Sequence, residues 1–198
     1  MSNMSNETHM STSAFAMHRL SRPFSLVIVW ALVVAAAMSG PTTARASSNL
    51  FRGSFEGNPG DRWEGFTGED GRTGFDIDKG TSRSGKNNGW LYADHGWAAE
   101  RIAVHLSGFG PRTRCTASIF MEPLGGSAQV GLQVWDPNGW HVISETYPVV
   151  DGNQYSVVSS PWLDLSAFDT VYVQAIYGNH GGPAKYVRLD DMTLECGG

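Results

Sequence analysis

The sequence predicts an all-β protein, an antiparallel β-sandwich with jelly-roll topology. Apolar and polar residues alternate with a period of two along almost all of the chain after residue 46. No window of about 11 or more residues in that part keeps a helical period. Turn-forming sequences rich in Gly, Asn, Asp and Pro separate the alternating runs. Short strands in this number bury their apolar sides best as two packed sheets.

The alternating runs define about ten expected strands. In chain order they are 49–56, 74–78, 90–94, 100–106, 114–121, 128–135, 140–147, 156–163, 170–177 and 186–195. Gly125-Gly126 and Asp136-Pro-Asn-Gly139 are typical of the turns between them. Residues 165–169 are expected to form at most one short helical turn.

The first 46 residues have the features of a secretion signal. Arg19 and Arg22 precede an uncharged apolar run at 26–38, and Ala44-Arg-Ala46 offers the small residues that a signal peptidase reads. The run is shorter than the roughly 20 residues that span a bilayer. We therefore expect a signal peptide at 1–46 and a single domain at 47–198, secreted to the extracellular space and free of the membrane after cleavage; the alternative is an uncleaved anchor.

The charge of the mature chain excludes some partners. Removing Glu7, Arg19, Arg22 and Arg45 leaves 18 acidic and 11 basic residues, a formal charge of −7. The basic residues are scattered, so the chain lacks the basic patch of a nucleic-acid-binding protein. An acidic surface also disfavours polyanionic ligands. We expect a monomer that binds no nucleic acid.

Two cysteines, Cys115 and Cys196, lie in the mature part. An exported chain meets an oxidising compartment, which favours a disulfide between them. Such a bond would join the last strand to a strand near the middle of the chain. The alternative is two separate buried thiols, because spacing alone does not show that the sulfurs meet.

The alternation also predicts which side chains leave the core. In 128–135 the apolar residues Val130, Leu132 and Val134 face inward, and in 170–177 Val171 and Val173 do so. The opposite face then carries aromatic rings among amides, which suit the apolar faces and the hydroxyls of a sugar ring. The candidate ligand-binding residues are Gln133, Trp135, His141, Tyr147, Tyr172 and Gln174.

The two chain ends carry carboxylates within strand-like sequence. Asp190 and Asp191 interrupt the apolar alternation of the last strand, and Glu56 ends the first. Buried carboxylates need a partner. A hard cation that takes oxygen ligands is one partner that could tie both ends together.

Three segments resemble secreted bacterial carbohydrate-binding modules of families 4, 9 and 22, which have a galactose-binding-like jelly roll. They are Asn49-Leu-Phe-Arg-Gly-Ser-Phe-Glu-Gly57, Asp78-Lys-Gly-Thr-Ser-Arg-Ser-Gly-Lys86 and Val187-Arg-Leu-Asp-Asp-Met-Thr-Leu194. The resemblance implies a secreted, non-catalytic module that binds a neutral polysaccharide or oligosaccharide.

The resemblance also implies a structural calcium ion. Its acidic ligands fall on Glu56 and Asp190, with Asp191 a less favoured choice, and its carbonyl ligands fall between Lys79 and Ser84. The alternative is that these carboxylates only cap strands and accept backbone hydrogen bonds.

Two other classes of function remain open. A small jelly-roll glycoside hydrolase or lyase would need a pair of carboxylates across a groove. The best acid–base cluster is His141, Glu145 and Tyr147, which we expect on one face of the 140–147 strand, but no convincing catalytic motif accompanies it. A protein-binding or adhesive envelope domain is the third class, because fold does not fix function.

Overall fold

The computed structural model describes residues 49–179 and 181–197. The signal peptide expected at 1–46 lies outside them. The described strands, in chain order, are β1 Asn49–Gly53, β2 Trp63–Gly68, β3 Arg72–Ile77, β4 Asn87–Ala93, β5 Trp97–His105, β6 Arg114–Pro123, β7 Ala128–Gln129, β8 Gly131–Asp136, β9 His141–Thr146, β10 Val149–Val150, β11 Ser156–Ser159, β12 Thr170–Gly178 and β13 Lys185–Gly197. One 3-10 turn, η1, covers Pro59–Asp61. In these residues no helix is long and apolar enough to cross a membrane.

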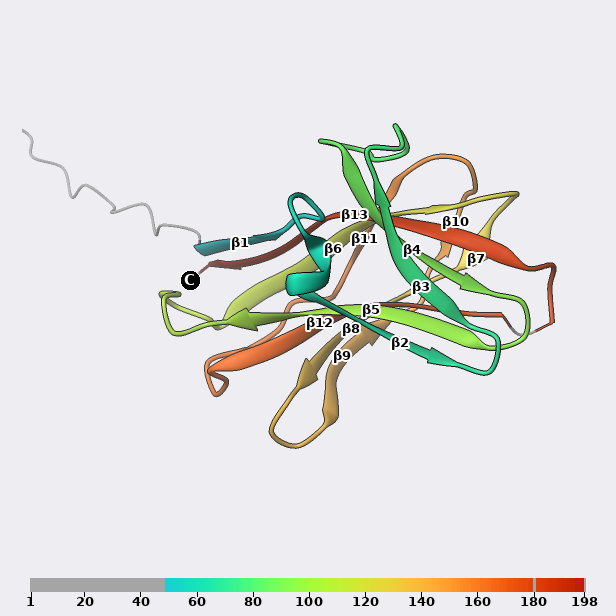
Figure 1. Ribbon diagram of the computed structural model, residues 1–198. Coiled ribbons are helices and arrows are strands. Elements are labelled where there is room, and N and C mark those ends of the chain that lie inside the picture. The colour runs from blue at the N-terminus through green and yellow to red at the C-terminus, as the bar shows by residue number, and fades with distance from the viewer. Residues whose placement is uncertain (1–48, 180, 198) are drawn as a thin grey trace, which may run out of the picture. The chain divides into compact units, whose positions relative to one another are not determined.

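The strands form two packed antiparallel sheets, as the sequence predicts (Figure 1). The six-stranded sheet has the order β11-β6-β13-β4-β3, with β1 also paired to β13. The five-stranded sheet has the order β2-β5-β12-β8-β9. The short strands β7 and β10 pair with each other as a separate two-stranded sheet. The chain crosses between the sheets at the β2–β3 and β4–β5 turns, so neighbouring segments of sequence supply both layers.

The core lies between the sheets and consists of the predicted inward set. Leu132 and Val134 on β8 and Val171 and Val173 on β12 are buried. They meet inward residues of the other sheet such as Leu189. Burial of these apolar side chains supplies the main driving force for folding.

Some strand predictions are wrong. The strand β2 is missed, because its sequence Trp-Glu-Gly-Phe-Thr-Gly contains two glycines and little apolar alternation. The run 128–135 is not one strand: it breaks at Val130, whose amide donates to Pro148 O at 3.0 Å, so β7 leaves the sheet that β8 joins. By contrast, the single short turn expected at 165–169 is present: the Phe168 amide donates to Leu165 O at 3.1 Å.

The last strand and the middle of the chain are linked covalently. Cys115 on β6 and Cys196 on β13 stand opposite each other in the strand register and form a disulfide. The two residues are 81 positions apart in sequence. The bond therefore closes a large loop and fixes β13 beside β6.

The disulfide predicts a clear loss of stability on reduction. In the chain-entropy model, a loop of this length contributes about 4 kcal/mol by restricting the unfolded chain. Free-thiol titration of denatured, non-reduced secreted protein should find no thiol. Two reactive thiols, or a melting temperature that a reductant leaves unchanged, would contradict this assignment.

One carboxylate lies inside the sandwich. Glu100 on β5 is 1% exposed and accepts a hydrogen bond at Oε1 from the Thr73 hydroxyl of the opposite sheet. Its Oε2 is the one buried side-chain oxygen or nitrogen without a hydrogen-bond partner among the described residues. Burial raises the pKa of Glu100 to about 7, and the Thr73 hydrogen bond opposes that rise only in part.

The raised pKa of Glu100 predicts that the free energy of unfolding falls as the pH rises. Below the unfolded value of 4.5 the group is protonated in both states, and between 4.5 and about 7 only the folded protein keeps the proton. The free energy of unfolding should fall by about 3 kcal/mol across this window and level off above it. Urea unfolding at pH 4 and pH 8 measures the difference.

Glu100→Gln should remove this part of the pH dependence, since an amide does not ionise. Glu195→Gln, which changes an exposed carboxylate of β13, is the matched control and should keep the wild-type slope. Equal slopes in wild type and Glu100→Gln would show that Glu100 does not titrate in the window.

Candidate functional site

The outer face of the five-stranded sheet is hollowed. Among the outward positions on β5, β8 and β12, three carry a small side chain or none: Ala99, Gly131 and Gly178. Two adjoining hollows of about 480 and about 200 Å³ lie there, and they share Trp97, Trp135 and Gln174. We call these two hollows together the groove.

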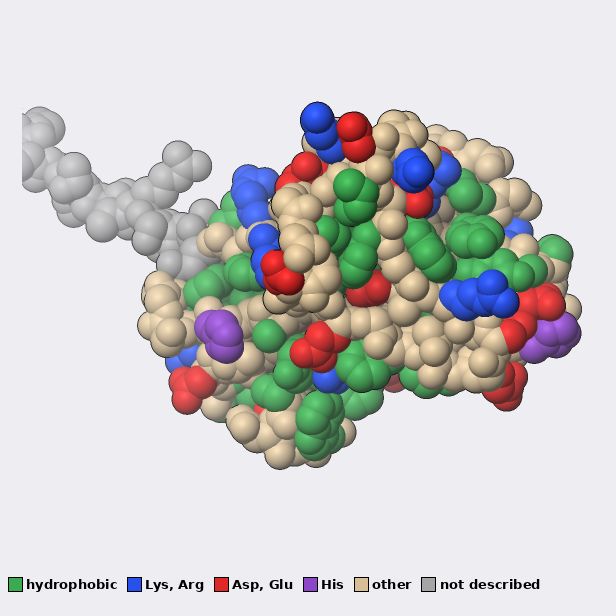
Figure 2. Space-filling view, in the orientation of Figure 1, with side chains coloured by type: hydrophobic (Ala, Val, Ile, Leu, Met, Phe, Trp, Pro, Cys, Tyr) green, Lys and Arg blue, Asp and Glu red, His purple; other side chains and the backbone are tan. Residues whose placement is uncertain are grey.

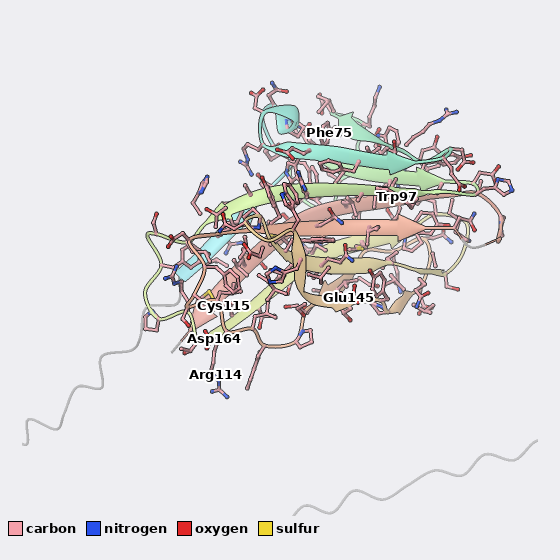
Figure 3. The ribbon with its side chains drawn as sticks, turned by 90° about the horizontal axis from the view of Figure 1, so that it is seen from below. Phe75, Trp97, Arg114, Cys115, Glu145 and Asp164 are labelled. Atoms are coloured by element: carbon pink, nitrogen blue, oxygen red, sulfur yellow. A yellow bond between two sulfur atoms is a disulfide. The ribbon has the colours of Figure 1, made fainter. Side chains whose placement is uncertain are left out.

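Aromatic rings at the groove lie down over glycines. Gly68 is directly opposite Trp97 in the register of β2 and β5, and a Cβ at Gly68 would overlap the Trp97 indole. A Cβ at Gly131 would likewise lie 2.5 Å from the Tyr147 ring. The missing Cβ atoms let the rings rest on the sheet. Figure 3 labels Trp97 on β5 and Glu145 on β9.

A hydrogen-bonded network of amides and rings forms one wall. Gln133 stands at its centre: its Oε1 accepts from Gln174 Nε2 at 2.7 Å and from Trp135 Nε1 at 3.2 Å. Its Nε2 donates to the Tyr147 hydroxyl at 2.6 Å and to Glu145 Oε2 at 3.2 Å. The Tyr147 hydroxyl in turn donates to Glu145 Oε2 at 3.1 Å. The two glutamines are thus held in fixed orientations.

Burial and the neighbouring Glu145 carboxylate raise the pKa of Tyr147 above its usual value. The phenol therefore stays protonated at neutral pH. It keeps donating to Glu145.

A guanidinium holds together the far side of the groove. Arg101 donates to Glu64 Oε2 from Nε and NH2, at 3.0 and 2.8 Å. Its guanidinium carbon also lies 4.1 Å from the Phe66 ring centre and 4.2 Å from that of Tyr172. Trp140 stacks on Tyr172 with ring centroids 6.2 Å apart. The Glu64 carboxylate neutralises the charge of Arg101 where it faces the groove.

Trp140 stands at the tip of the β8–β9 hairpin. It is 60% exposed and has a φ of 50°, a conformation that is rare for a bulky residue. The hairpin thus holds a large ring in a strained position at the rim of the groove, a combination that is common at binding sites.

The structure brings most of the predicted ligand-binding residues together. Gln133, Trp135, Tyr147 and Gln174 line the groove, and Tyr172 lies beside it under Trp140. Gln133 and Gln174 are only 6% and 8% exposed, although they are on the outer face. Neighbouring rings cover them, which a period-two pattern does not show.

His141 is not brought to the groove. The register of β8 and β9 shifts between Val134 and Trp135, so that one extra residue of β9 is accommodated. The shift puts His141 opposite Asp136, with Nδ1 3.6 Å from Asp136 Oδ2, while Glu145 stays opposite Gln133. The expectation that His141 and Glu145 share one face is therefore wrong, and the acid–base cluster is not assembled.

Sequence reasoning missed several residues of the groove, Trp97 and Arg101 among them. Trp97 borders both hollows, but it lies before the predicted strand 100–106. Arg101 lies within that run and carries a charge, so its cover by aromatic rings was not expected. Gly68 opposite Trp97 would indicate a ring lying flat on the sheet, but this pair can be found only when the pairing of β2 with β5 is known.

No protein-family model matches the chain, and no curated protein matches it. Solved structures do match. A family 61 carbohydrate-binding module in complex with β-1,4-galactotriose has a TM-score of 0.53 at 12% identity, over 73% of this chain and 95% of that one. The fold is that of carbohydrate-binding modules.

Family 22 modules show the same likeness. The xylan-binding domain from Paenibacillus barcinonensis Xyn10C has a TM-score of 0.51 at 12% identity, over 77% of this chain and 97% of that one. The C-terminal family 22 module of Clostridium thermocellum Xyn10B has a TM-score of 0.50 at 16% identity, over 75% and 92%. The suspected similarity to such modules is confirmed at the level of the fold.

The carboxylates of Glu56 and Asp190, near the two ends of the described chain, accept hydrogen bonds from backbone amides. Glu56 Oε1 accepts from the amides of Lys86 and Asn87 at 2.8 and 2.9 Å. Asp190 Oδ2 accepts from the amides of Arg83 and Ser84 at 2.8 and 3.0 Å. The two carboxylates thus hold the 79–86 loop over the six-stranded sheet.

These contacts do not fit a calcium site between Glu56 and Asp190. The loop turns N–H donors to both carboxylates, and Asp190 Oδ1 also accepts from the Asp191 amide at 2.8 Å. Ser84, one of the loop residues expected to offer a carbonyl, donates its amide to Asp190 Oδ2. Burial raises the pKa of Asp190, and the amides oppose that rise.

Calcium binding stays a prediction from the resemblance, and melting curves test it. An ion that binds only the native state stabilises by mass action, so calcium would raise the melting temperature and EDTA would lower it. Asp190→Asn would abolish that response. If neither addition moves the curve and elemental analysis finds no metal, the amide contacts alone hold the loop.

Proposed function

We propose that the protein is a non-catalytic module that binds a neutral polysaccharide or oligosaccharide in the groove. One observation carries the proposal: flat aromatic rings and fixed amides converge on one hollow of an otherwise regular sheet. Pyranose rings stack their C–H faces on aromatic rings while their hydroxyls need polar partners. The groove offers aromatic rings and polar groups close enough together for one sugar chain to contact both.

The polar atoms of the groove favour a neutral ligand. Glu145 brings a negative charge to the wall, and the positive charge of Arg101 is compensated by Glu64. An acidic sugar would meet repulsion from Glu145 without a free cation in return. Glu145 Oε1 has no hydrogen-bond partner among the described residues, so it offers an acceptor to hydroxyls.

Secretion is part of the proposal and rests on the sequence of residues 1–46. A glycoside hydrolase or lyase remains the alternative within the same ligand class. Hydrolysis by the usual route needs two carboxylates flanking the bond, whereas the residues that line the groove include no Asp or Glu. Glu145 and Glu64 only contact lining residues, Gln133 and Arg101. Retention of a polysaccharide without release of reducing sugar supports a module, and release supports an enzyme.

Native affinity gels with embedded xylan, galactan, glucan or mannan test the ligand class. The mature protein should be retarded by at least one neutral polysaccharide. Trp135→Ala should weaken that binding by about 2 kcal/mol, or roughly 30-fold, because stacked aromatic anchors dominate such contacts. Its melting temperature should change little, since Trp135 points away from the core.

The other variants sharpen the test. Trp97→Ala should weaken retention to a similar degree. Gln133→Ala should do so as well, because it leaves Gln174 Nε2 and Trp135 Nε1 without their acceptor. Trp162→Ala is the matched control: this ring is 71% exposed and lies against Arg114 of β6, in the other sheet. Lost stability in Trp135→Ala with unchanged binding per folded molecule would contradict the groove. A wild type that no gel retards would contradict glycan binding.

A further inference from the structure

The outer face of the six-stranded sheet carries a second aromatic surface. Trp90 on β4 and Tyr186 on β13 have ring centroids 5.6 Å apart, and Tyr186 also packs on Tyr92 at 4.7 Å. Tyr186 is 46% exposed. Figure 2 shows hydrophobic side chains gathered beside charged ones on the right of the molecule. This surface is separate from the groove, because the core lies between the two sheets.

Trp90 is seated in the same way as Trp97. Gly74 is directly opposite Trp90 in the register of β3 and β4, as Gly68 is opposite Trp97. A Cβ at Gly74 would lie 2.7 Å from Trp90 Cζ2, so the indole rests on the sheet over the glycine. The device that shapes the groove therefore recurs on the opposite sheet.

Charged groups flank this ring. Arg188 is opposite both Trp90 and Glu122 in the strand register, and its NH1 lies 3.1 Å from Glu122 Oε2. A hollow of about 330 Å³ is lined by Trp90, Arg188, Asp76, Tyr186 and Leu124. It is at the small end of the range of roughly 300 to 1,000 Å³ for ligand pockets. A ring face, a guanidinium and a carboxylate thus converge on one small space.

The 79–86 loop contacts one residue of the hollow, Asp76. The Thr81 hydroxyl donates to Asn88 Oδ1 at 2.6 Å and to Asp76 Oδ2 at 3.3 Å. The Tyr155 hydroxyl donates to Thr81 O at 2.9 Å and fixes the loop from above. The small volume of the hollow suits a single sugar ring.

We propose that this hollow is a second sugar site, which takes one terminal or branch ring of a neutral glycan on Trp90. The ligand class rests on the proposed function of the groove. Glu122 compensates the charge of Arg188, and Asp76 adds a negative charge, so an acidic sugar is disfavoured. With sites on opposite sheets, one molecule bridges two glycan segments.

Indole N–H signals in NMR spectra of the isotope-labelled mature protein test the two sites separately. The probes are the hexasaccharides of xylan, galactan, glucan and mannan, and single Trp→Phe variants assign the signals. In the wild type, the signals of Trp90 and Trp97 should both shift with at least one probe, and that of Trp162 should not. In a groove variant, Trp97→Ala with Trp135→Ala, the Trp90 signal should still shift.

Each outcome is decisive. A Trp90 signal that stays fixed while the Trp97 signal shifts overturns the second site and leaves the groove intact. Shifts at Trp162 as large as at Trp90 mean unspecific contact and also overturn it. If no signal moves with any probe, the proposed function fails and the second site with it. Tyr186→Ala, checked by melting curves, should abolish the remaining shift of the Trp90 signal in the groove variant, and a shift that survives places the sugar elsewhere.

Discussion

The alternation of side chains along antiparallel strands is the constraint on which both the core and the groove depend. Successive residues point to opposite faces, so the set that fills the core also decides which residues reach the surface. On β12, burial of Val171 and Val173 requires Tyr172 and Gln174 to face outward. A slip of one residue would exchange the two sets. The groove therefore comes from the same register that packs the sandwich.

The strand register decides which residues lie on the outer face of the five-stranded sheet, and glycines on that face create the hollow. A regular outward face is a layer of side chains of similar height. Where Gly68 and Gly131 remove that layer, the rings of Trp97 and Tyr147 lie down, and the space beside them becomes the hollow. Glycine weakens a strand by entropy and by lost packing. Here a resting aromatic ring restores the packing, so both the hollow and the sheet are retained.

Local pattern accounts for most of the fold and for part of the site. The sandwich, the core and four groove residues follow from alternation, because each depends only on residues two apart. The position of His141 does not follow, since it depends on a register shift that the partner strand β8 imposes on β9. Nor does Trp97, whose role depends on Gly68 in a strand that the pattern missed. The missing information is strand pairing, which joins residues far apart in sequence.

The lack of pairing information in the sequence also left the partners of the carboxylates near the chain ends open. The sequence shows that Glu56 and Asp190 need partners, but it does not show whether the partner is an ion or an amide. In the structure the 79–86 loop donates amides to both carboxylates, and these hydrogen bonds order the loop.

The polar residues of the groove are likewise held by hydrogen bonds within the protein. Gln133 is fully engaged before any ligand arrives, so its neighbours are already in place, and binding loses little side-chain entropy to order them. Affinity in such a groove depends on how well a sugar fits the fixed rings and less on how far the protein can adapt.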